Sequence, residues 1–465
     1  MPTFAEFTPT LNNFLQQGFI ARWMEEGLDS NLAFARQATS ETIGGHIGSS
    51  VKIAKSGRKA PVTTAMNPAN LNSNLNNGMN PSTAPTEQYE YDLQEWGDTD
   101  QVDLLGNTAL AADNLQRITR NNAVQAAQSI ERLAKIELHG CYNGGNTFVR
   151  PDLGANSTTS VHVDDIRGFE FVSSNGVYVP VSSNNPLTVF EVRTSYAGVN
   201  QSFQVINATP DGTTASLFPF SSLDGNGNAL SDGVSGVLTI QGAAVAPVGG
   251  DALIAINAPK VVRPLNKPST MMLSAGDTMT LNTVLNARKV LLSNGVPLMP
   301  DGTYHFLHSP NVQQQLFSDP MFIAAFNGAQ NTPEYQDGRV FRFLGITFIC
   351  TTETYVQPPC PALGLNVPVE RSILMGAGAL NKADYAGLES YLGLDLATSV
   401  GAATIVGGIA QIYRSPLDLL LRFMSATWTW VGCFLCPTDR TATNVIIPTA
   451  NAADYKRAVV IETAG

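Results

Sequence analysis

The chain has 465 residues, which is long enough for two or three domains. Hydrophobic residues make up 43% of it and charged residues only 14%, a composition typical of a protein that buries much surface in cores or interfaces. The formal net charge is -11. This acidic balance argues against a general nucleic-acid binder, because neutralising phosphates requires clustered Lys and Arg.

The first residues predict no export signal, because residues 1–10 contain neither a cationic start nor an apolar run. Residues 11–24 carry apolar side chains at helical spacing, among them Phe14 and Trp23. This pattern predicts an amphipathic helix that docks under a neighbouring subunit or, equally well, packs on its own chain. Five scattered cysteines do not suggest a disulfide framework, so we expect synthesis in a reducing cytoplasm.

A long polar excursion follows, between two runs that alternate like strands at residues 49–55 and 88–94. The segment between them is rich in Asn, Pro, Ser and Thr. The charges are divided between the two sides of the excursion. The outgoing side carries the basic residues Lys52, Lys55, Arg58 and Lys59, and the returning side carries the acidic residues Glu87, Glu90, Asp92 and Glu95. We expect these opposite charges to pair across a hairpin or between copies of the chain. A mobile surface loop is the alternative.

Residues 107–139 predict one very long helix. The apolar stripe consists of Leu115, Ile118, Ala126, Ile130 and Leu133. Asn107 or Thr108 would cap its start, Glu131 would pair with Lys135 one turn later, and Gly140 would take a left-handed exit. Such a helix would be about 50 Å long, too long for one compact core to bury. The alternative is two helices that break near Asn121 and Asn122.

The pattern then changes to short β runs, which predict an inserted all-β domain over residues 151–262. The runs lie at residues 161–163, 169–172, 177–181, 187–192, 203–206, 237–240 and 253–256. Strands at this spacing are typical of a small sandwich or barrel. Nine acidic residues face three basic ones in this stretch, a local charge of -6 that suggests a solvated, self-contained module.

The remainder predicts mixed α and β structure. We expect a helix over residues 276–292, a helical turn near residues 311–326, and strands around residues 341–350 and 426–436. Residues 396–413 form a long uncharged run. Their weak hydrophobicity and β-branched content favour buried strands over a membrane span.

No motif predicts an active site. Cys433 and Cys436 form a CxxC pair, but no second pair completes a tetrahedral zinc site. His305 and His308 have the HxxH spacing of metal ligands, but no carboxylate lies at a sequence position suited to complete a site. We therefore favour packing and turn capping as the roles of the two histidines. Asp224 begins a calcium-like loop that lacks its glycine and its final carboxylate. We therefore expect no enzyme activity, no cofactor and no metal site.

Several motifs in the same order resemble one known family. They are LNNGMNPS, LQEWGDTDQVD, SIERLAKIELHGCYNG, HSPNVQQQLFSDPMF, EYQDGRVFRFLGITFICTTE and SPLDLLLRFMSATWTWVGCF. Together they are similar to major capsid proteins of tailed double-stranded DNA bacteriophages, in particular the coat family of Enquatrovirus-like podoviruses.

The resemblance implies an α+β chain with the Hong Kong 97-type capsid fold. Its parts would be an N-terminal arm (1–48), an extended loop (49–95), a spine helix with peripheral domain (96–150), the inserted β domain (151–262) and the remaining peripheral and axial domains (263–465). It further implies a homo-oligomer of hexamers and pentamers that meets portal, scaffold and decoration or cement proteins.

By the same resemblance, the protein would assemble in the bacterial host cytoplasm and become a virion capsid. The shell would enclose double-stranded DNA without specific binding and without contacting a membrane. Two alternatives stay open, an encapsulin-type compartment shell and a β-rich surface or array protein. The second should begin with an export signal.

Overall fold

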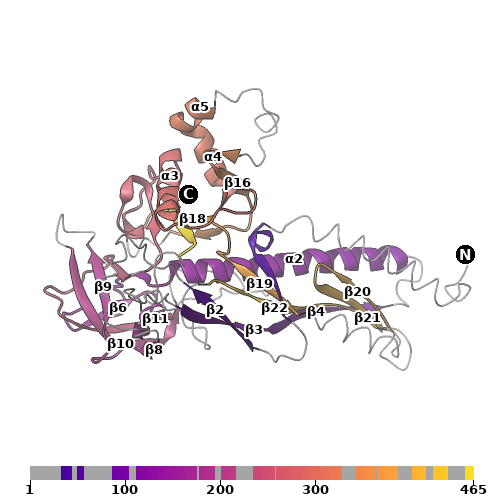
Figure 1. The fold of residues 1–465 in the computed structure, drawn as a ribbon, viewed down its shortest axis with the longest axis horizontal. Helices are drawn as coiled ribbons and strands as arrows, with labels where there is room; N and C mark the ends of the chain where they lie inside the picture. Colours follow the sequence, from indigo (N-terminus) through magenta and orange to yellow (C-terminus); the bar gives the residue numbers. More distant parts are fainter. Residues whose placement is uncertain are drawn as a thin grey trace, which may run out of the picture.

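The computed structural model describes residues 33–43, 50–56, 86–103, 111–174, 177–193, 200–215, 234–256, 258–326, 342–359, 361, 364–385, 401–414, 423–437 and 456–465. Figure 1 shows an elongated molecule in which one long helix runs along the long axis, with a β module at one end of it and a smaller α/β layer to one side. A few helices stand among many strands that pair mainly antiparallel, so the predicted α+β class is confirmed.

The long helix is α2, Ala111–Asn143, and it is continuous over 33 residues. The predicted single helix is confirmed, and the alternative break is wrong, because Asn122 is buried and donates its side-chain amide to the Ala426 carbonyl at 3.4 Å. The predicted exit at Gly140 is also wrong. The helix runs on to Asn143, and the left-handed residue is Gly145, with φ 75°. The expected caps Asn107 and Thr108 lie outside the described residues.

One face of α2 packs on a mainly antiparallel sheet. The described strands of this sheet are β1 (Thr39–Ile43), β19 (Asn381–Tyr385), β22 (Phe423–Leu435), β21 (Ile409–Arg414) and β20 (Gly401–Val406), with β4 (Gln94–Asp103) on the other side of β22. Ala126 and Ile130 of the predicted stripe are buried against Trp428 and Trp430. The strands expected within residues 396–413 and 426–436 are therefore confirmed.

A second sheet carries three shorter helices. Its described strands are β13 (Val261–Val262), β23 (Ala458–Ala464), β18 (Val369–Met375), β14 (Tyr304–His308), β16 (Ile346–Cys350), β15 (Arg342–Phe343) and β17 (Tyr355–Gln357). The helices are α3 (Leu281–Ser293), α4 (Pro310–Ser318) and α5 (Pro320–Phe326). Every residue of β18 and β23 is buried, as expected for central strands covered on both faces. The predicted helix at 276–292 starts later, at the N-cap Thr280.

The inserted region is a barrel. Its described sheet consists of β5 (Asn146–Phe148), β12 (Ala252–Ala255), β9 (Leu187–Val192), β10 (Gln201–Ala215), β11 (Val234–Gln241) and β6 (Ser160–Val163). A bridge between Val149 and Val163 joins the two edges, and the Arg150 N–H donates to the His162 carbonyl at 2.9 Å. Closure removes the exposed edges. A separate hairpin pairs β7 (Phe171–Ser174) with β8 (Val177–Pro180).

All the strands that the sequence predicts in the inserted region are present. Inward side chains such as Leu187, Val189 and Phe203 fill the barrel, while Phe190 between them is 46% exposed. This alternation is the period of two that predicted the strands. None of the helices in the described part of the chain combines the length and hydropathy that a membrane span requires.

Candidate interaction surfaces

The charged excursion predicted from sequence forms an antiparallel hairpin at its base. Strand β2 (Ser50–Ser56) pairs with β3 (Thr86–Asp92), and this register places Lys52 opposite Glu90 and Lys55 opposite Glu87. Residues directly opposite each other in antiparallel strands are close neighbours. The register thus aligns basic and acidic positions across the hairpin, while pairing of these charges, within the hairpin or between copies, stays a prediction. Arg58 and Lys59 lie outside the described residues.

The base of this hairpin is anchored to the sheet under α2. Tyr91 is fully buried and packs with Ile43, Ala383 and Leu435, while the neighbouring Asp92 is exposed. Figure 1 places β2 and β3 alongside the sheet, near the middle of the molecule.

Glu95 does not belong to the hairpin but to β4, a strand that sequence analysis missed. Within the described residues β4 pairs only with β22, and residues 94–101 are all exposed. Glu95 accepts a hydrogen bond from Thr429 at 3.2 Å, and Asp98 accepts one from Gln125 at 2.6 Å. Acidic side chains on an edge strand discourage indiscriminate pairing with other strands. β4 thus offers a long, acidic, solvent-facing edge.

A buried carboxylate holds the start of the described chain onto the long helix. Glu131 is fully buried and accepts hydrogen bonds from three successive backbone N–H groups, those of Ala33 (2.9 Å), Phe34 (2.6 Å) and Ala35 (3.0 Å). These groups begin the short 3-10 helix η2 (Ala35–Gln37). Burial raises the pKa of Glu131 although the three N–H groups favour its charged form.

The predicted pairing of Glu131 with Lys135 is therefore wrong. Glu131 turns to the N-terminal segment, and the Lys135 ammonium lies 4.0 Å from Glu353, which Arg132 also contacts at 3.3 Å. The remaining candidates for contact between copies, Phe14 and Trp23, lie outside the described residues, as does the calcium-like loop at Asp224.

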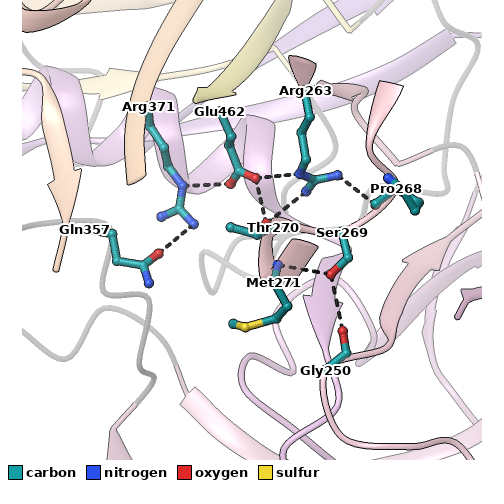
Figure 2. Close-up of polar contacts among 9 residues, drawn as sticks. All are labelled: Gly250, Arg263, Pro268, Ser269, Thr270, Met271, Gln357, Arg371 and Glu462. Atoms are coloured by element: carbon teal, nitrogen blue, oxygen red, sulfur yellow. Dashed lines mark hydrogen bonds and ion pairs between the residues drawn. The ribbon is translucent and has the colours of Figure 1, made fainter. Parts of the chain in front are cut away.

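A buried charge cluster surrounds Glu462 on β23. Arg371 lies directly opposite on β18 and donates its Nε to one carboxylate oxygen at 2.9 Å. Arg263 donates to the other oxygen at 2.8 Å, and Thr270 donates to the same oxygen at 2.6 Å. Figure 2 shows the two guanidinium groups reaching the carboxylate from opposite sides.

Electrostatics keep Glu462 ionised. Burial alone would raise its pKa, but Arg263 and Arg371, together with the Thr270 hydroxyl, lower the pKa to about 2. Arg371 also stacks over Tyr355, with its guanidinium carbon 5.1 Å from the ring centroid. These contacts lie within the fold and connect β18 and β23 to the segment after β13.

The Glu462 cluster is connected to the barrel through the segment after β13. Arg263 donates to the Pro268 carbonyl at 2.8 Å, and the next residue, Ser269, donates to the Gly250 carbonyl of the inserted region at 3.2 Å (Figure 2). Sequence analysis missed this cluster. Charged residues within apolar strands, such as Glu462 and Arg371, were the available signal.

The two spaced histidines have unrelated surroundings. His305 contacts Asp301 at 2.9 Å and also Gln37, whereas His308 is buried beside Phe306 and Phe348 and contacts the Ser309 carbonyl at 3.0 Å. Burial lowers the pKa of His308 to about 4. These contacts agree with the favoured interpretation of packing and turn capping.

No known family model and no curated protein matches the chain. Solved structures are similar to it over nearly their full length. The capsid of Ralstonia phage GP4 aligns with a TM-score of 0.48 and 12% identity, covering 94% of this chain and 92% of that one. The cyanophage Pam1 capsid aligns with a TM-score of 0.43 and 11% identity, covering 94% of each chain. A virus-like particle from Pyrococcus furiosus aligns with a TM-score of 0.35 and 7% identity, covering 96% and 99%.

Proposed function

We propose that this chain is a structural subunit that assembles into a closed icosahedral shell. More specifically, we propose the major capsid protein of a tailed double-stranded DNA phage, with the Hong Kong 97-type fold. The observation that carries the proposal is the elongated frame formed by α2, its sheet and the anchored β2–β3 hairpin. These elements are too long for one small hydrophobic core to bury.

The frame suits repeated contacts between copies. A helix of about 50 Å is a rigid beam at about 1.5 Å per residue. Its first half still has exposed positions at Arg117, Arg120 and Gln125, and β4 beside it is open along one edge. Closed shells repeat one set of contacts in slightly different geometries, which requires rigid bodies joined by adaptable segments. The β2–β3 hairpin, anchored through Tyr91, would supply a contact with a neighbouring copy.

The finer assignments rest on the sequence motifs. Resemblance to Enquatrovirus-like coat proteins supports hexamers and pentamers, assembly in a bacterial cytoplasm, and contact with portal, scaffold and decoration proteins. The acidic net charge of -11 fits a shell that encloses DNA without gripping it. We further propose that the role is structural rather than catalytic, because the buried polar clusters described above are occupied by contacts within the fold.

Sedimentation velocity of the purified full-length chain tests the proposal. Across a series of protein concentrations and ionic strengths, alone and with its scaffold, we expect a boundary of very large particles alongside small capsomers. A single compact monomer under all these conditions would contradict a shell-forming role.

A further inference from the structure

The C-terminal end of α2 brings together three potential metal ligands that lie far apart in sequence. Glu137 and Cys141 are one helical turn apart and therefore share a face. Cys436 follows directly after β22 and is 299 residues from Glu137. The carboxylate oxygen and the two sulfur atoms all lie within 4.8 Å of one another.

Hydrogen bonds already organise these groups around one point. The Cys141 thiol donates to a Glu137 carboxylate oxygen at 3.2 Å, and the Cys436 backbone N–H donates to the same oxygen at 3.4 Å. The Cys436 sulfur lies 3.8 Å from the Glu137 backbone oxygen. Cys141 and Cys436 are at most 1% exposed, so the packing of the core fixes both thiols.

The spacing and the donor types fit a tetrahedral zinc ion. Zn–S bonds of about 2.3 Å place two sulfurs of a tetrahedral site about 3.8 Å apart, so the two sulfur atoms would have to approach each other by about 1 Å at most. Thiolates select zinc over magnesium or calcium, and a carboxylate is a common third ligand. Glu137, though neither of the two cysteines, lines a cavity of about 140 Å³ together with Asp92, Trp430 and Cys433, so an ion would approach the site from the Glu137 side.

We propose that Glu137, Cys141 and Cys436 form a structural zinc site that ties the end of the long helix to the end of β22. Binding would release the two thiol protons to solvent and leave two thiolates and one carboxylate on the ion. The site is independent of the proposed shell function, since it lies within one subunit. Sequence analysis set aside Cys436 because Cys433 was its only near partner, whereas the fold supplies a partner from α2.

Titration of the metal-free, full-length protein with Co²⁺ in a phosphine reductant tests the proposal. We expect one equivalent to produce thiolate-to-cobalt absorption, and Zn²⁺ to displace it. Cys141→Ser and Cys436→Ser should lose the absorption, and Glu137→Gln should weaken binding. Cys350→Ser, at an exposed thiol on β16, is the matched control and should bind like the parent chain.

A second measurement on the unmutated chain covers the case in which a variant fails to fold. Alkylation at urea concentrations that transiently open the chain, followed by mass spectrometry, should show that Zn²⁺ slows the reaction of Cys141 and Cys436 while Cys350 reacts at an unchanged rate. The proposal is wrong if the folded parent chain gives no cobalt–thiolate absorption, if Cys436→Ser retains it, or if Zn²⁺ protects neither buried cysteine.

Discussion

At the scale of single residues, the fold depends on buried charges whose partners come from other elements. Glu462 neutralises two arginines that would otherwise be buried without a carboxylate. We expect Glu462→Gln to lower the free energy of unfolding by about 3–5 kcal/mol, since it leaves buried positive charge uncompensated. Urea unfolding measures this change.

The matched control for Glu462 is Asp152, which also pairs with an arginine. The Asp152 side chain is 45% exposed and lies 2.6 Å from Arg150. Because solvent screens such a pair, Asp152→Asn should cost only about 0–1 kcal/mol. Equal losses of unfolding free energy in the two variants would show that the Glu462 cluster stabilises the fold no more than an exposed ion pair does.

Because of His139, we predict that the subunit loses stability in mild acid. Burial, together with the nearby charges of Lys135 and Arg371, lowers its pKa to about 3 from an ordinary value of 6.5. Both of its ring nitrogens lack a hydrogen-bond partner among the described residues. Below pH 6.5 the unfolded chain therefore binds a proton that the folded chain does not, so stability falls as pH falls toward about 3.

The part of the loss that is due to His139 should be about 2 kcal/mol between about pH 7 and about pH 5. His139→Leu removes the titrating ring while keeping an apolar group of similar size. We expect its unfolding midpoint in urea to change less over this pH range than that of the parent chain. An unchanged pH dependence would show that another group is responsible.

At the scale of elements, the distal excursion should be dispensable for folding but needed for assembly. Ser56 and Thr86 are paired in register at the ends of β2 and β3, so a two-residue Asn-Gly turn can replace residues 57–85. We expect a folded subunit with an unchanged far-UV spectrum and a sharp loss of shells in sedimentation. Shells of normal yield and stability would show that assembly does not need the excursion.

Periodic elements could be predicted from sequence, and irregular ones could not. The α2 stripe and the barrel strands repeat apolar residues at 3.6 and 2 positions, so burial and pattern agree. β4 was missed because QEWGDTDQVD is an exposed edge strand without an apolar face. The end of α2 was misplaced because Gly140 is helical and buried inside the fold, so its tertiary setting overrides its local preference.

The clusters around Glu131, Glu462 and Cys436 could not be predicted for a related reason. Each joins residues about a hundred or more positions apart, or residues on adjoining strands whose register is unknown before folding. Local spacing suggested Lys135 as the partner of Glu131 and Cys433 as the partner of Cys436. The fold replaced both with groups from distant segments.

At the scale of the whole molecule, the inserted region should fold on its own. The barrel has its own core, but its first strand, β5, lies before the boundary at residue 151 expected from sequence, and closure uses Val149. We therefore expect a fragment of residues 145–260 to melt cooperatively, as followed by circular dichroism.

The shorter fragment of residues 161–262 is the matched control. It lacks β5 and the closing bridge, so it exposes two sheet edges and should melt at a lower temperature or aggregate. If the longer fragment is disordered, the barrel depends on the rest of the subunit. If the two fragments melt alike, closure contributes little to its stability.

Electron cryo-microscopy of particles formed by the full-length chain tests the central claim most directly. We predict closed shells built of hexamers and pentamers, with α2 and the β2–β3 hairpin at contacts between neighbouring copies. Contradiction would come from a compact monomer, or from particles in which α2 and the hairpin face solvent and contact no other copy.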